Sequence, residues 1–138
     1  MLSALELQFI ERQRVSHLAT ADRSGRPHVV PVCFAQLDER FYIAIDEKPK
    51  RSVRLKRLRN IEENPRVSLV FDRYDDDWER LGWVLVQGTA FVLVEGPEHE
   101  RALAALRERY KQYHAMALEG RPVIRVTVER VSSWGDLS

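Results

Sequence analysis

The chain has 138 residues, with 22 lysines and arginines against 21 aspartates and glutamates, so its formal net charge is only +1. This length is typical of one hydrophobic core, and we expect residues 1–138 to form a single domain. The balance of charge argues against a nucleic-acid partner.

The sequence also excludes several other classes of protein. No apolar run approaches the roughly 18 residues that a membrane span needs. The opening segment, MLSALELQFIERQR, carries acidic residues where a secretory signal would be basic. We therefore expect a cytoplasmic protein without a membrane partner. Cys33 is the only cysteine, which excludes an internal disulfide and gives no metal-ligand pattern.

Hydrophobic periodicity and turn residues predict a mainly β chain with three helices. A capping box of Ser3 and Glu6 begins the first helix, and Asn64-Pro65 ends the second. The predicted helices are 3–13, 51–62 and 97–117, and the predicted strands are 15–21, 28–35, 41–45, 67–71, 83–94 and 123–131. The first two strands form a hairpin across a turn at 22–27. Six short antiparallel strands with helices at the ends predict a small β-barrel.

Two strands contain residues that interrupt a regular ladder. Pro31 has no N–H to donate, so it marks either a sheet edge or a bulge. Gln87-Gly88 lies in the middle of the longest predicted strand, where a polar pair indicates a bend or a close approach of a ligand. The acidic triplet 75–77 is interpreted as a solvated loop, with a divalent-metal site as the weaker alternative.

The stretch KPKRSVRLKRLRNIEENPRVSLV, residues 48–70, contains a dense basic cluster. Leu55, Leu58 and Ile61 form one apolar stripe, which leaves the basic side chains on the rest of the helix. A solvated helix face is the plain interpretation. Because only Glu62 and Glu63 offer neutralising partners within the helix, we favour a bound phosphate or carboxylate. The basic residues are Lys48, Lys50, Arg51, Arg54, Lys56, Arg57 and Arg59.

No pattern of catalytic side chains is present in the sequence. The four histidines, at positions 17, 28, 99 and 114, are scattered among ordinary strand and helix residues. We therefore predict no catalytic residue and no metal site. If the protein is an enzyme, a bound cofactor carries the chemistry and the chain supplies placement and electrostatics.

Two segments, GRPHVVPVCFA and FYIAIDEKPKRSVRLKRLRNIEENPRVSLVFD, resemble the flavin-binding split-barrel superfamily that includes pyridoxamine 5'-phosphate oxidase. Within it, they are most similar to the actinobacterial branch that uses the deazaflavin coenzyme F-420. The resemblance covers residues 5–134 and implies a six-stranded antiparallel split β-barrel of the α+β class. It also implies a homodimer with two sites at the subunit interface.

The resemblance implies a role for each candidate residue. Lys56 and Arg57 match the basic pair that holds the cofactor phosphate, and Gln87 matches a polar residue near the cofactor. The backbone of Pro31, Val32, Cys33 and Phe34 matches the strand that faces the cofactor ring. The further cations Lys48, Lys50, Arg51 and Arg54 exceed what one phosphate needs, which suits the phosphodiester and glutamate tail of coenzyme F-420 better than FMN.

Three hypotheses follow from the resemblance. The first is a reductase that uses reduced coenzyme F-420 to transfer hydride to an unsaturated organic acceptor. The second is an FMN-binding oxidase or flavin reductase, and the third is a non-enzymatic carrier of coenzyme F-420 or flavin. The chain ends shortly after Trp134 without the arginine-bearing segment of true pyridoxamine phosphate oxidases, which argues against that substrate. The sequence leaves the acceptor and the proton donor open.

Overall fold

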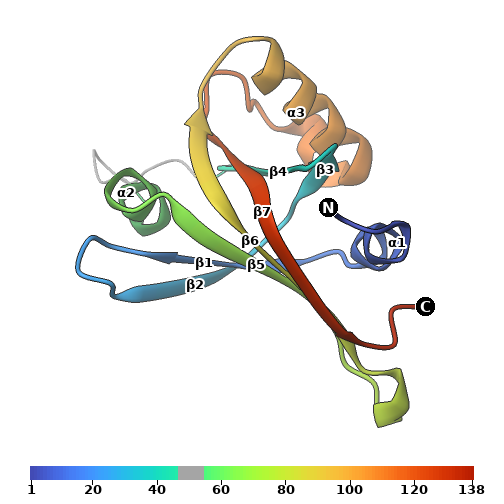
Figure 1. Cartoon of the computed structure of the whole chain (residues 1–138). Helices are drawn as coiled ribbons and strands as arrows, with labels where there is room; N and C mark the ends of the chain where they lie inside the picture. Colours follow the sequence, from blue (N-terminus) through green and yellow to red (C-terminus); the bar gives the residue numbers. More distant parts are fainter. Residues whose placement is uncertain (47–54) are drawn as a thin grey trace.

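The computed structural model describes residues 1–46 and 55–138, and these form one antiparallel sheet with three α-helices (Figure 1). The strands are β1 Ser16–Ala21, β2 Pro27–Val32, β3 Ala35–Leu37, β4 Arg40–Ala44, β5 Arg66–Arg73, β6 Gly82–Leu93 and β7 Val123–Gly135. The helices are α1 Ala4–Arg12, α2 Lys56–Glu63 and α3 Pro97–Arg109, with short 3-10 turns η1 Trp78–Arg80 and η2 Lys111–Ala115. The sheet order is β2-β1-β5-β6-β7-β4-β3.

The predicted split-barrel fold is confirmed, but the prediction of six strands is wrong because the structure has seven. The predicted strand 28–35 divides into β2 and β3 at Cys33 and Phe34. The Phe34 N–H donates to the Tyr110 hydroxyl at 3.1 Å instead of joining a ladder. As a result β2 pairs with β1, whereas β3 pairs with β4 at the other edge of the sheet.

Two hydrophobic clusters hold the helices on the sheet, and they lie on opposite faces of β4. In the first, α1 and α2 pack on β1, β5 and β6 around the rings of Phe34, Phe41 and Phe71, whose centroids lie 4.9–6.1 Å apart. In the second, Leu103 and Leu106 of α3 pack on β4 and the start of β7. The predicted capping box at Ser3 is present at the start of α1. These contacts leave one face of the central strands free of packed helices in the part of the chain described.

The two interruptions seen in the sequence have different structural causes. Pro31 lies in the edge strand β2 opposite His17, and the β1–β2 register is regular, so the proline marks an edge. Gln87 and Gly88 mark a bulge between β6 and β7. A side chain at Gly88 would place its Cβ 2.0 Å from the Thr127 carbonyl oxygen, so only glycine permits this close approach.

Candidate cofactor site

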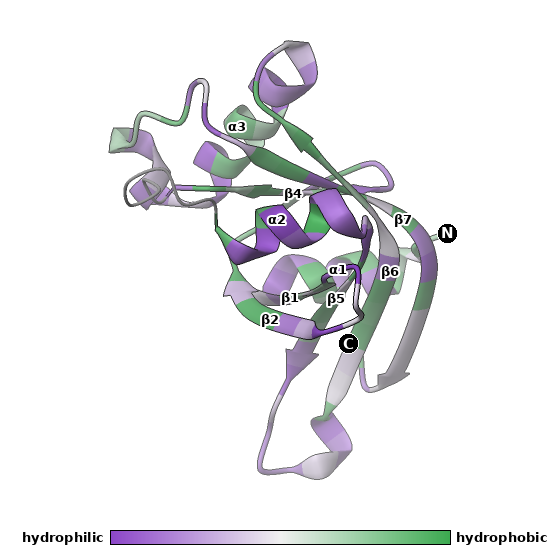
Figure 2. Ribbon diagram, turned by 90° about the vertical axis from the view of Figure 1, so that its left-hand side faces the viewer, coloured by the Kyte–Doolittle hydropathy of each residue, from purple (hydrophilic) through white to green (hydrophobic). Residues whose placement is uncertain are grey.

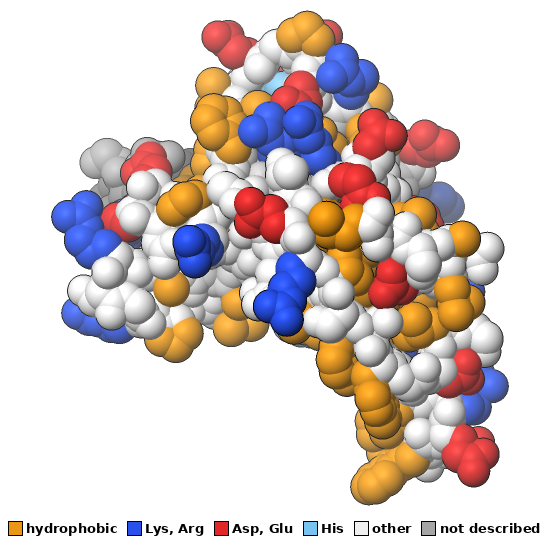
Figure 3. Space-filling view, viewed as in Figure 1, with side chains coloured by type: hydrophobic (Ala, Val, Ile, Leu, Met, Phe, Trp, Pro, Cys, Tyr) orange, Lys and Arg blue, Asp and Glu red, His pale blue; other side chains and the backbone are white. Residues whose placement is uncertain are grey.

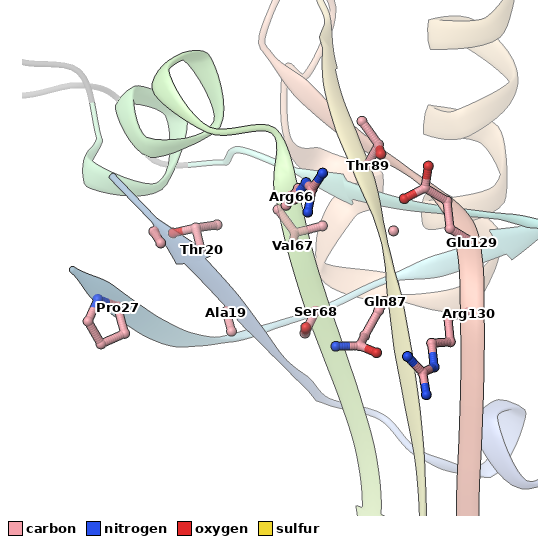
Figure 4. Close-up of a pocket in the computed structure, with 12 residues that line it drawn as sticks. Ala19, Thr20, Pro27, Arg66, Val67, Ser68, Gln87, Thr89, Glu129 and Arg130 are labelled. Atoms are coloured by element: carbon pink, nitrogen blue, oxygen red, sulfur yellow. The ribbon is translucent and has the colours of Figure 1, made fainter. Parts of the chain in front are cut away.

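A groove of about 640 Å³ crosses the outer face of the sheet, opposite the main core (Figure 4). It is floored by β1, β5, β6 and β7, and one residue of β2 closes its side. The lining residues are Ala19, Thr20, Ala21, Pro27, Arg66, Val67, Ser68, Gln87, Gly88, Thr89, Glu129 and Arg130. The groove is wide enough for a planar ring lying on the strands.

The strand register explains why polar groups gather in the middle of this groove. Ser68 of β5 lies opposite Gln87 of β6, and Gln87 lies opposite Arg130 of β7, so the three side chains form a row (Figure 4). The bulge inserts Glu129 as an extra residue next to Arg130, and both side chains are exposed. The bulge therefore presents two adjacent charged residues to the groove.

The groove carries more positive than negative charge. Arg66 and Arg130 are exposed, and neither guanidinium has a carboxylate partner among residues 1–46 and 55–138. Glu129 is the one acidic residue in the lining. Something outside the described chain must neutralise these two cations if the groove is covered.

Helix α2 lies across the ends of the strands, with hydrophilic residues over most of its surface (Figure 2). The predicted stripe is confirmed, since Leu58 and Ile61 are buried and Leu55 is half-buried against the core. The helix begins at Lys56, later than the predicted residue 51. Of the predicted cations, Lys48, Lys50, Arg51 and Arg54 lie outside the described residues.

Within residues 1–46 and 55–138, one cation of the predicted phosphate-binding pair has a carboxylate partner and the other has none. Lys56 Nζ lies 3.9 Å from Asp22 Oδ2, a partner from the β1–β2 turn that the sequence did not reveal. Hydrogen bonds from the backbone N–H groups of Arg26 and Ser24, helped by the charge of Lys56, lower the pKa of Asp22 although burial opposes this. Arg57 is half-buried, and its Nε is buried without a hydrogen-bond partner among the described residues. This orphaned donor fits an anionic ligand.

Asn60 is a site-forming residue that sequence reasoning missed. Its side chain is fully buried, and Nδ2 donates to Thr20 Oγ1 of β1 at 3.0 Å. Its Oδ1 has no hydrogen-bond partner in the described ranges. This bond ties α2 to the strand that forms one wall of the groove. The sequence does contain a signal that could have identified Asn60: it is a polar residue between Leu58 and Ile61, on the side of the helix predicted to be buried.

The predicted ring-facing segment does not send its side chains into the groove. Val32 and Phe34 are buried in the core, while Pro31 is exposed on the edge strand. Cys33 is half-buried beside Tyr113, where burial and then the neighbouring thiol raise the pKa of the tyrosine. Any ring contact here would be through backbone atoms. Of the predicted site residues that the structure describes, Gln87 lines the groove.

The remaining polar clusters have structural partners. Asp75 pairs with Arg80 at 3.1 Å and Asp77 caps η1, so two of the three carboxylates in the acidic triplet have internal partners. His99 is buried, with Nε2 2.7 Å from the Arg121 carbonyl oxygen. No group of three metal-ligating side chains occurs in the described ranges. No helix within those ranges is long and apolar enough to span a membrane.

Comparisons with known proteins agree with this fold. Residues 4–135 match the family described as pyridoxamine 5'-phosphate oxidase. The chain is 30% identical over 131 residues to a 5a,11a-dehydrotetracycline/5a,11a-dehydrooxytetracycline reductase of Streptomyces rimosus, covering 94% of this chain and 80% of the relative.

Solved structures share the architecture over almost the whole chain. A FAD-binding protein from Mesorhizobium loti is 29% identical with a TM-score of 0.70, covering 96% of this chain and 94% of that protein. The heme storage protein HutZ of Vibrio cholerae shares the fold at 21% identity with a TM-score of 0.75, covering 97% and 94% of the two chains. The chain therefore belongs to the pyridoxamine 5'-phosphate oxidase family of split-barrel proteins, and is a flavin-related oxidoreductase or binding protein.

Proposed function

We propose that this protein is a reductase that binds reduced coenzyme F-420 and transfers hydride to a conjugated organic acceptor. The reductase from Streptomyces rimosus, which acts on a dehydrotetracycline, supports both the reaction type and a planar, unsaturated acceptor. The cations at 48–57 support a cofactor with more negative charge than one phosphate.

The observation that carries the proposal is Arg57 at the start of α2, whose buried Nε has no hydrogen-bond partner in the part of the chain that the structure describes. A half-buried arginine with an orphaned Nε is costly unless an anion completes its hydrogen bonds. Lys56 adjoins it, and Asp22 neutralises only part of the local charge. A phosphate would relieve this arrangement, as it would in any member of the family that binds a phosphorylated cofactor.

Each group of residues would have a distinct task. Arg57 and Lys56 would hold the cofactor phosphate, and Gln87 would offer its amide to polar atoms of the ring. The cofactor, when bound, supplies the hydride. The outward side chains of Val70 and Leu85 border the polar row and would limit access of water. Orientation of the acceptor is the main contribution of the chain to the rate.

FMN is the alternative cofactor, and the Mesorhizobium loti FAD-binding protein at 29% identity favours it. An FMN-dependent oxidase or flavin reductase would use the same phosphate-binding pair. A non-enzymatic carrier would bind coenzyme F-420 or flavin without transferring hydride. We further propose a cytoplasmic homodimer with a site at each subunit interface, since the groove lies on the outer face of the central strands, which no described helix covers.

The test begins with the colour of the purified protein. Protein made in a host lacking coenzyme F-420 is expected to be colourless, whereas a yellow protein with the spectrum of FMN would favour the alternative. Fluorescence titration then ranks the two cofactors. Lys56→Ala with Arg57→Ala should weaken binding of the preferred cofactor about 100-fold, since each hydrogen bond to a charged group contributes about 1.5–3 kcal/mol.

Arg101→Ala is the matched control, because Arg101 is an exposed arginine on α3, far from the groove in the sheet order. Unchanged affinity in the double variant would refute the site. Tight binding without hydride transfer to any quinone or conjugated acceptor tested would identify a carrier.

A further inference from the structure

Strand β1 contacts both parts of the proposed cofactor site. Residues 19–21 of this strand line the groove, where Ala19 and Ala21 are half-buried (Figure 4). Side chains alternate along a strand, so that of Thr20 points to the opposite face, where it is buried beneath α2. A single strand therefore lies between the groove and the helix that carries Lys56 and Arg57.

Three polar residues on one side of α2 contact the β1–β2 hairpin. They recur at helical spacing, and the pairs are Lys56 with Asp22, Asn60 with Thr20, and Glu63 with Arg23. Charged side chains of both signs accordingly lie next to one another over this part of the surface (Figure 3). The Lys56 side chain is 43% exposed and that of Arg23 is 80% exposed, so these two surface contacts fix the helix only weakly.

The Asn60–Thr20 hydrogen bond is the buried contact of the three. Asn60 is fully buried and Thr20 is 4% exposed, so water does not compete for the 3.0 Å bond from Nδ2 to Oγ1. Leu58 and Ile61 also hold α2 on the core, but apolar packing is not directional. The hydrogen bond therefore sets where the helix lies along β1 and how it is rotated.

The buried amide of Asn60 is not explained by stability. Its Oδ1 has no hydrogen-bond partner among the described residues, and a buried acceptor without a partner destabilises the fold. A leucine would fill similar space without that penalty, and it would continue the apolar stripe of Leu58 and Ile61. Buried polar groups that do not stabilise can instead fix one specific arrangement of packed elements.

We infer that Asn60 is a positioning residue for the cofactor phosphate. Asn60 lies one helical turn after Lys56 and Arg57, so its bond to Thr20 sets the place of this basic pair relative to the groove. The chain thereby selects a cofactor whose phosphate and ring are separated by a matching distance. The inference rests on the proposed function and adds the residue that joins the phosphate site to the ring site.

Fluorescence titration with paired ligands tests this role. FMN is compared with riboflavin, and coenzyme F-420 with the same deazaflavin lacking the phosphate and tail; the ratio of the two dissociation constants in a pair is the phosphate advantage. Thr20→Val should lower the phosphate advantage about tenfold, because the basic pair is displaced. Thr20→Ser keeps the hydroxyl and should restore it to within about twofold of native. Since Thr20 also borders the groove, a lost ring contact would weaken both members of a pair equally.

Two further variants separate positioning from stability. Asn60→Leu with Thr20→Val replaces both partners by apolar groups, so the melting temperature should equal or exceed that of the native protein while the phosphate advantage stays low. Ser16→Ala is the matched control, because it removes another buried hydroxyl of β1, which donates to the Val70 carbonyl oxygen of β5 at 2.8 Å instead of bonding to α2. Ser16→Ala should lower the melting temperature and leave the phosphate advantage unchanged.

An unchanged phosphate advantage in Thr20→Val would overturn the inference, and so would equal weakening of both ligands in a pair. Arg57→Met distinguishes this failure from failure of the proposed function. If Arg57→Met lowers the phosphate advantage and Thr20→Val does not, only the positioning role is wrong. If neither variant lowers it, or if the native protein has no phosphate advantage, the phosphate site itself is wrong and the positioning role fails with it.

Discussion

The arginines in two charged regions of this protein differ in whether they have a carboxylate partner among the described residues. Where α3 meets the sheet, the Glu98 carboxylate accepts from Arg40 at 2.8 Å, from Tyr42 at 2.7 Å and from Arg125 at 3.0 Å. At the groove and the start of α2, Arg57, Arg66 and Arg130 have no carboxylate partner in the described chain. The first region has its counter-charge within the described chain, although Arg125 Nε, like Arg57 Nε, is buried without a hydrogen-bond partner there, whereas the second region lacks a carboxylate in the described chain.

The difference separates residues that stabilise the fold from residues that bind. Burial opposes the charge on Glu98, but hydrogen bonds from Tyr42 and Arg125 outweigh it and lower the pKa of the carboxyl group. The Arg125 guanidinium also stacks on Phe91, 5.0 Å from the ring centroid. These contacts fix α3 to the sheet. Arg57, Arg66 and Arg130 have no such carboxylate among the described residues, which fits the anionic ligand proposed above.

The largest expected effect comes from destroying the bulge beneath the binding region. Gly88→Ala would push a Cβ against the Thr127 carbonyl oxygen, and we expect it to lower the free energy of unfolding by about 3 kcal/mol. Thermal unfolding followed by circular dichroism measures this loss. Gly120→Ala is the control, since that Cβ would meet no atom within 4 Å and only the positive φ of 77° is strained. Equal losses in both variants would show that the close approach is unimportant.

Removing the Glu98 carboxylate should lower the free energy of unfolding by less than Gly88→Ala does. It should leave cofactor affinity unchanged. Glu98→Ala leaves Arg40, Tyr42 and Arg125 without their shared acceptor, so we expect a loss of about 2 kcal/mol in the free energy of unfolding. Cofactor affinity, measured by fluorescence titration, should not change. A fall in affinity would mean that the Glu98 cluster and the groove are energetically coupled.

Lowering the pH should reproduce part of the loss of stability expected for Glu98→Ala. Because the pKa of Glu98 is lowered in the folded protein, its contribution is fully present above its ordinary value of 4.5 and disappears as the pH falls through the lowered pKa. The melting temperature of the native protein should therefore decline more steeply below pH 4.5 than that of Glu98→Gln. Parallel curves would contradict this assignment.

The smallest effect on stability is expected at Arg57. Arg57→Met keeps the apolar part of the side chain on the core and removes an unpaired charge, so the free energy of unfolding should change by no more than about 0.5 kcal/mol. Cofactor affinity should nevertheless fall about tenfold, as expected for one lost charged hydrogen bond of about 1.5 kcal/mol. A large loss of stability with intact affinity would reverse the roles given to the two regions.

Local patterns predicted most of the fold but not the division of one strand. The capping box, the α2 stripe and the β1–β2 hairpin are local features, and the structure confirms all three. The break at Cys33 and Phe34 depends on the Tyr110 hydroxyl, which lies 76 residues away in the chain. A strand propensity averaged over 28–35 contains no information about that contact, so a single strand was predicted.

The candidate site was predictable to a similar extent. The local sequence indicates both Gln87 and the basic character of α2; Gln87 lines the groove, and the binding role of these residues stays a prediction. The pairing of Lys56 with Asp22, the Asn60–Thr20 bond and the row that includes Ser68 and Arg130 depend on the packing of strands distant in sequence. Periodicity gives the face of each element, but not which faces meet.

The proline in the outermost strand has a consequence for how this protein behaves at high concentration. Positions 27, 29 and 31 of β2 share one side of the strand, and prolines occupy two of them. An incoming β-strand from another molecule would find few amide donors along that border, so ladder-to-ladder growth into fibrils is suppressed. The prolines therefore disfavour association through the β2 edge of the sheet. Association through a sheet face, which can give a closed oligomer of fixed size, is left as the easier route.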